Sequence, residues 1–134
     1  MPLRLAAAEW WSAFGIPPYE ALEESTLATF ITIGYGDRAG YDRTPESLRN
    51  AAHAHDARLV ADGVLMGTVG DCVQVRNPEA SGVTQSAGPF MRSDLPLAGF
   101  AVIEAATLEE AVQIVARSPC AIAHGVVEIW PLRP

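Results

Sequence analysis

Histidines are the residues of this chain best suited to acid–base chemistry, because the imidazole pKa lies near neutrality. His55 falls in the segment 45–62, which has helical periodicity and places Leu48, Ala52 and Leu59 on the same face. A buried imidazole requires a hydrogen-bond partner. We therefore interpret His55 either as a candidate catalytic base in a cleft or as a core histidine bonded to the sheet.

His53 lies two positions earlier, about 200° around the same helix, so the two imidazoles do not face one site. His53 and Asp56 are three residues apart, a spacing that lets them share an ion or a hydrogen bond. Two ligands are too few for a tight metal site, and we expect no metal or other cofactor. A solvated surface pair is the simpler interpretation of these two residues.

Three further residues are candidates for substrate binding. Arg92 follows a Gly-Pro turn, where it can clamp a carboxylate or pair with Asp94. Tyr35 follows a predicted strand, at a position where its side chain can lie at the edge of a cleft. His124 precedes a glycine near the last strand, and is either a loop residue or a contact in the same cleft as His55.

Two other sequence patterns do not indicate a dinucleotide-binding site or a redox site. The stretch 34–40 has the spacing Gly-x-Gly-x-x-x-Gly, which differs from the dinucleotide-binding Gly-x-Gly-x-x-Gly, and no second βαβ half is present. We interpret it as a loop. Cys72 and Cys120 are too far apart in the chain for a CxxC motif, and we expect both to pack as small apolar residues.

The composition excludes several classes of function. The chain has 134 residues, a net charge of −7 and no lysine, which excludes Schiff-base and Walker-type lysine chemistry. Its arginines are scattered singly, so no nucleic-acid or membrane partner is expected. No apolar run approaches the ~20 residues of a membrane span, and the N-terminus lacks signal-peptide features, so a cytoplasmic location is expected.

A small α+β domain must position these candidates. Runs of β-branched and aromatic residues predict strands at 28–34, 64–67, 72–75, 82–86, 97–104 and 126–130. Helices are predicted over 45–62, with Thr44 as the N-cap, and over 107–118, where Thr107 and Glu110 form a capping box. The order predicts a ferredoxin-like split βαβ fold, in which an antiparallel sheet carries two helices on one face and an inserted hairpin.

The chain is predicted to have two parts. Residues 1–26 form an N-terminal leader with a short helix, and we expect Trp10, Trp11 and Phe14 to pack on the domain or on a partner subunit. Residues 27–134 form the α+β domain.

Six short motifs occur in order along this domain: Ile-Gly-Tyr-Gly-Asp (33–37), Gly-Val-Leu (63–65), Ala-Gly-Pro-Phe (87–90), Leu-Ala-Gly-Phe (97–100), Ala-Arg-Ser-Pro (116–119) and the ending Ala-His-Gly-Val-Val-Glu-Ile-Trp-Pro (123–131). Over residues 28–133 they resemble the YCII-related family, and most closely its subgroup named for the Asp-Gly-Pro-Phe (DGPF) motif. Ala87 stands where that motif has Asp, and Ala52 stands where the family usually has a histidine in the first helix.

The resemblance implies a ferredoxin-like homodimer of the dimeric α/β barrel type, with a cleft between sheet and helices. Most such proteins have no assigned reaction, although some relatives are linked to dehalogenation of ring-cleavage products at a His–Asp pair. The resulting hypothesis is a cofactor-free enzyme for proton transfer, elimination or isomerisation on a small organic acid, with His55 as base and Arg92 holding the anion. The alternative is a non-catalytic ligand-binding or assembly module.

Overall fold

The computed structural model describes residues 27–134, and the predicted leader over residues 1–26 lies outside the described residues. The elements follow in the order β1 (Ala28–Tyr35), α3 (Arg38–Asp42), α4 (Glu46–Ala61), β2 (Leu65–Thr68), β3 (Val73–Arg76), η1 (Pro78–Ala80), β4 (Thr84–Ala87), β5 (Leu97–Ala105), α5 (Leu108–Val115), α6 (Pro119–Ile122) and β6 (Val126–Pro131).

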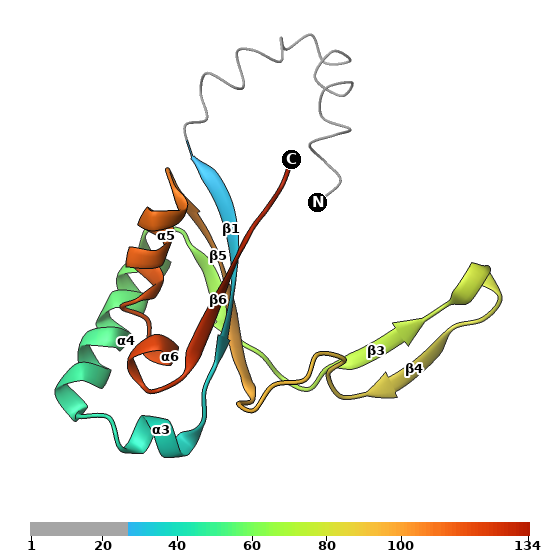
Figure 1. Ribbon diagram of the computed structural model, residues 1–134, viewed down its shortest axis with the longest axis horizontal. Helices are drawn as coiled ribbons and strands as arrows, with labels where there is room; N and C mark the ends of the chain where they lie inside the picture. Colours follow the sequence, from blue (N-terminus) through green and yellow to red (C-terminus); the bar gives the residue numbers. More distant parts are fainter. Residues whose placement is uncertain (1–26) are drawn as a thin grey trace, which may run out of the picture.

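The main sheet has four strands in the order β2-β5-β1-β6, and every neighbouring pair is antiparallel. This arrangement confirms the predicted α+β class with an antiparallel sheet, and it is consistent with a ferredoxin-like fold. The strands do not close into a barrel within residues 27–134. Helices α4, α5 and α6 lie on one side of the sheet (Figure 1).

The predicted inserted hairpin forms from β3 and β4, which pair only with each other in the described structure. It projects away from the sheet as an arm (Figure 1). Val73, Val75 and Val83 are exposed along it. Cys72, expected to pack as a core residue, is exposed at the base of this arm instead, because no element of residues 27–134 covers the hairpin.

Alternate residues of the strands face the helices and form the core, as strand geometry requires. Phe30 of β1 lies opposite Ile103 of β5, and both are almost fully buried. The buried cluster is completed by Ala105 of the same strand and by Ala111 and Val115 of α5. We call this side of the sheet the covered face.

The intervening residues of the same strands form the uncovered face, which no described helix overlies (Figure 1). The face is largely apolar, and Leu65, Phe100, Val102, Val126 and Trp130 are all exposed on it. The strand register places Ile31 beside Val102 and Trp130. Ile33, Tyr35 and Glu128 lie on the same face.

The helix ends follow their local sequence with one exception. Gly63 adopts a positive φ of 95° just after α4, as a C-terminal glycine does. The Thr107 side chain accepts a hydrogen bond from Glu110 N, and the Glu110 carboxylate accepts one from Ala106 N. Thr44, predicted to cap α4, does not do so: its hydroxyl donates to the Gly40 carbonyl instead, and Pro45 takes the N-cap position.

Two short helices differ from the sequence prediction. Part of the stretch interpreted as a loop forms α3, because the Asp37 side chain caps it by accepting a hydrogen bond from Gly40 N. Pro119, predicted to end a helix, begins α6, where its missing N–H has no cost in the first turn. Within residues 27–134, no helix combines the length and apolarity needed to cross a bilayer.

Candidate functional site

A cavity of about 390 Å³ lies between the covered face and the helices. Its floor exists because the strands carry very small residues there, namely Gly34, Gly99 and Ala101. A Cβ atom added to Gly34 would lie 2.9 Å from the Cys120 sulfur, so a larger residue there would force the Cys120 side chain of α6 to shift. Larger side chains at these positions would fill the space that the helices leave.

Most of the cavity wall is apolar. Leu59 of α4, Met66 of β2, Ile114 of α5 and Val127 of β6 contribute to it. A concave apolar site with a few convergent polar groups is the usual form of a small-molecule site. The position of the polar groups therefore decides what chemistry the cavity can support.

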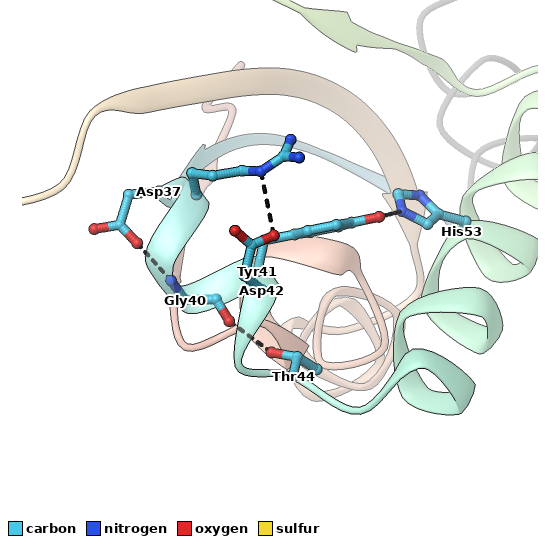
Figure 2. Close-up of polar contacts among 7 residues, drawn as sticks. Asp37, Gly40, Tyr41, Asp42, Thr44 and His53 are labelled. Atoms are coloured by element: carbon cyan, nitrogen blue, oxygen red, sulfur yellow. Dashed lines mark hydrogen bonds and ion pairs between the residues drawn. The ribbon is translucent and has the colours of Figure 1, made fainter.

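Three polar residues of the lining come from α3 and α4: Tyr41, His53 and Asp56. The Tyr41 hydroxyl and His53 Nε2 are 3.0 Å apart and share a hydrogen bond (Figure 2). The bond runs in either direction, because the tautomer of His53 decides which group donates. The pair is therefore able to exchange a proton at the cavity.

The short helix α3 is tied at both ends, and this fixes Tyr41. Gly40 N donates to Asp37 Oδ1 over 2.8 Å, and the Thr44 hydroxyl donates to the Gly40 carbonyl over 2.7 Å (Figure 2). Thr44 is buried, so its hydrogen bond is protected from water. These contacts hold the Tyr41 ring in position to reach His53 on the next helix.

Two arginines lie over the Tyr41 ring. The guanidinium carbon of Arg49 is 4.8 Å from the ring centroid and that of Arg38 is 5.9 Å away, both within the range of cation–π attraction. Arg38 also pairs with Asp42, with 3.2 Å between Nε and Oδ1, but both side chains are exposed and the pair contributes little. Neither arginine belongs to the cavity lining.

Asp56 is partly buried, and burial raises the pKa of its carboxyl above the ordinary value, while His55 and His53 oppose this shift. The inner side of α4 is largely the one predicted from periodicity, because Ala52 and His55 are buried and Leu59 is partly buried, although Leu48 is half exposed. Asp56 and Arg49 are partly buried as well. The helix turns a polar edge toward the cavity.

Cys120 is the thiol of the cavity lining. Burial and the nearby Asp56 carboxylate raise the pKa of its thiol. A thiol acts as a nucleophile in its ionised form, so this environment works against nucleophilic catalysis by Cys120. Its role is that of a small apolar residue, as predicted.

His55, the candidate catalytic base from the sequence, is 6% exposed and does not line the cavity. Its Nε2 is 2.8 Å from the Ile114 carbonyl oxygen, which can only accept, so Nε2 carries the proton. This bond ties α4 to α5. The position corresponds to the core alternative, except that the partner is a helix carbonyl and not the sheet.

The predicted binding residues also lie outside the cavity lining. Tyr35 is buried on the uncovered face, where its hydroxyl donates to Glu128 Oε1 over 2.8 Å, and this bond raises the pKa of its phenol. Arg92 is exposed in the connection before β5, and it forms no ion pair with Asp94 within the described structure. His124 is exposed with a φ of 63° after α6.

The sequence identified His53 and Asp56 as a pair of surface residues; in the structure His53 is exposed and Asp56 is partly buried, and both line the cavity. The sequence feature that pointed to His53 and Asp56 was their three-residue spacing. No sequence feature pointed to Tyr41, because its approach to His53 depends on the α3 helix that the sequence did not predict. Within the part of the chain from residue 27 onward, no three His, Cys, Asp or Glu side chains are grouped to hold a metal ion.

Comparison with known proteins identifies the family. The YCII-related domain matches residues 29–134, and the chain belongs to this family. No curated protein matches the chain.

Proposed function

We propose that this protein is a cofactor-free enzyme that moves protons on a small organic molecule, by isomerisation or elimination, at the cavity beside α4. The observation that carries the proposal is the convergence of three groups on one apolar cavity: the hydrogen-bonded Tyr41–His53 pair and the partly desolvated Asp56 carboxyl. Perturbed carboxyl groups in such cavities are typical of acid–base sites.

In this proposal Asp56 acts as the base. Its carboxylate takes a proton from a carbon next to a carbonyl group, and the electrons of the broken C–H bond form a C=C bond as the carbonyl oxygen becomes an enol. A raised pKa makes the carboxylate a stronger base for this step. Return of the proton to a different carbon gives isomerisation, and loss of a leaving group gives elimination.

Tyr41 acts as the acid in the same step. When His53 Nε2 donates its hydrogen bond to the Tyr41 oxygen, the phenolic O–H is free to donate to the developing enol oxygen. A donor placed where charge develops is worth about 10²–10³ in rate in other enzymes. His55 takes no part in the chemistry here, and instead holds the helix that carries His53 and Asp56.

The test is solvent deuterium exchange, followed by proton NMR, into a panel of small ketones, lactones and enol acids. The wild-type protein is expected to catalyse exchange of at least one compound at the carbon beside its carbonyl. Asp56→Asn is expected to slow that exchange by about 10²–10⁴-fold, as loss of a general base does, and Tyr41→Phe by about 10²-fold.

His55→Gln serves as the comparison variant, because an amide can still donate to the Ile114 carbonyl. It is expected to keep most of the exchange activity. An exchange rate unchanged in Asp56→Asn, or lost only in His55→Gln, would contradict the assignment and return the catalytic role to the residue favoured by the sequence.

We also propose a homodimer that packs through the uncovered face, as in the dimeric α/β barrel type. The exposed Phe100, Val102 and Trp130 support it, since contiguous apolar patches on a sheet mark interaction sites. Sedimentation velocity of the full chain tests this part of the proposal. A monomer at micromolar concentration would contradict it.

The second candidate function is a non-catalytic ligand-binding or assembly module. The projecting arm favours it, because a two-stranded hairpin with exposed valines is marginal alone and is stabilised by packing on a partner. Under this alternative the cavity binds ligands but no compound of the panel exchanges deuterium.

Two finer assignments belong to the same proposal. The motif at residues 87–90 supports a place in the DGPF subgroup, and residues 1–26 are proposed to pack on the domain or on the partner subunit. Deleting residues 1–26 is expected to change the oligomeric state or the solubility. An unchanged dimer after the deletion would contradict this role of the leader.

A further inference from the structure

The charges around the cavity identify the kind of molecule that fits it. Four lining side chains are ionisable: Tyr41, His53, Asp56 and Cys120. None of the lining residues is an arginine, and the chain has no lysine. Within the described structure, His53 is the lining residue able to carry a positive charge, and its Nε2 is already engaged by Tyr41.

Asp56 gives this wall a negative character. Within residues 27–134 no side chain or backbone group donates a hydrogen bond to its carboxylate, and partial burial weakens its solvation. A second carboxylate placed beside it would meet like-charge repulsion, which partial burial screens less than bulk water does. It would also lose water, which is costly, while His53, the lining group able to become cationic, is already hydrogen-bonded to Tyr41.

The two nearby guanidinium groups do not add a positive charge to the cavity lining. Arg49 and Arg38 lie against the Tyr41 ring and outside the lining, and Arg38 is paired with Asp42. The predicted anion clamp, Arg92, is exposed and does not line the cavity. None of these three guanidinium groups lines the cavity.

Size and polarity complete the description. An apolar cavity of about 150 Å³ accepts benzene, so 390 Å³ has room for a substituted ring. Leu59, Met66 and Ile114 provide apolar contacts for the ring. The Tyr41–His53 pair provides one place where a carbonyl or hydroxyl oxygen is bound.

From these observations we infer that the cavity takes an uncharged, mainly apolar molecule of about one substituted ring with a single hydrogen-bonding group, and that Asp56 excludes carboxylates of the same shape. The inference rests on the proposed function and narrows its substrate class. The organic-acid hypothesis drawn from the sequence depended on Arg92 reaching the cleft.

The experiment compares benzamide with benzoate, which have the same shape and differ in charge. Protein labelled with ¹³C in the methionine methyl groups is titrated with each near neutral pH. Met66 lines the cavity, while Met91 is exposed outside it and serves as the internal reference. Benzamide is expected to shift the Met66 signal to saturation, and benzoate to bind at least about tenfold more weakly.

Asp56→Asn is the diagnostic variant, because it removes the charge and keeps the shape. Benzoate is expected to gain affinity until it matches benzamide, while the control Asp71→Asn, an exposed loop position, leaves the preference unchanged. Equal or tighter binding of benzoate to the wild-type protein overturns the inference. A Met66 signal that neither compound shifts also overturns it, and so does a preference for benzamide that remains in Asp56→Asn.

The wild-type comparison alone decides the charge preference if the variant does not fold. Binding is measured here without turnover, so the proposed function and this inference fail separately. Benzamide binding with no deuterium exchange in any compound of the panel would refute the catalytic proposal and leave the ligand class standing.

Discussion

The two faces of the four-stranded sheet are built from alternate residues of the same strands, yet they differ in every property that matters for function. On β5, Ile103 is 2% exposed under the helices, whereas its neighbour Val102 is 37% exposed on the opposite side. The covered face contains a cavity with ionisable groups along one wall. The uncovered face is largely apolar, and no element of residues 27–134 covers it.

The difference shows how one sheet can separate chemistry from assembly. On the covered face, small residues such as Gly34, Gly99 and Ala101 do not fill the space between the strands and the helices. This leaves room for a ligand. Larger apolar residues such as Phe100 and Trp130 on the other face leave a surface that water solvates poorly. The covered face therefore supports a ligand-binding site, and the uncovered face supports a contact between subunits.

The sharpest test of the comparison uses neighbouring residues of β5. Ile103→Ala removes buried methyl groups and is expected to lower the free energy of unfolding by about 2–5 kcal/mol, measured by urea denaturation. Val102→Ala, on the uncovered face, is expected to cost the monomer under about 1 kcal/mol. Similar losses for the two variants in a monomeric background would show that the faces do not differ in burial.

The next largest effect concerns association. Trp130→Asp places a charge on the uncovered face and is expected to weaken the proposed dimer by about 2 kcal/mol or more, roughly thirtyfold in Kd, measured by sedimentation. Val112→Asp, at an exposed position of α5, is the matched control and should leave the dimer intact. Dissociation caused by Val112→Asp alone would move the interface to the helical side.

The smallest expected effect is a pH dependence of stability from Asp56. Its folded-state pKa is raised above the ordinary value of 3.8, so its contribution to stability is present below that pH and is lost as pH rises through the folded pKa. Asp56→Asn should therefore gain stability relative to wild type as pH rises across this window, measured by denaturant unfolding. A relative loss with rising pH would show that the carboxylate is stabilised and not desolvated.

The fold was predictable from the sequence because its signals are local. The runs of β-branched and aromatic residues at 28–34 and 97–104 predicted the central strands, and Gly63 and the Thr107 capping box predicted helix ends. The helix α3 escaped prediction because a single side-chain cap from Asp37 forms it within a glycine-rich stretch. Propensity does not detect a helix that depends on one such contact.

The site was less predictable because it depends on tertiary packing. The apolar pattern of α4 predicted that Ala52 and His55 face inward, but it did not show that Asp56 also faces a cavity. The cavity itself arises from small residues on two strands far apart in the sequence. The His53–Asp56 spacing was visible, but only the packed structure gives it an apolar cavity to act in.

The most direct test of the account is an NMR titration that follows the histidine ring signals while the compound with the fastest deuterium exchange is added. We expect the His53 signals to shift with ligand occupancy, because His53 lines the cavity, and the His55 signals to remain in place, because its ring is held by the Ile114 carbonyl. Shifts at His55 with His53 unmoved would contradict the account and place the site on the other side of α4.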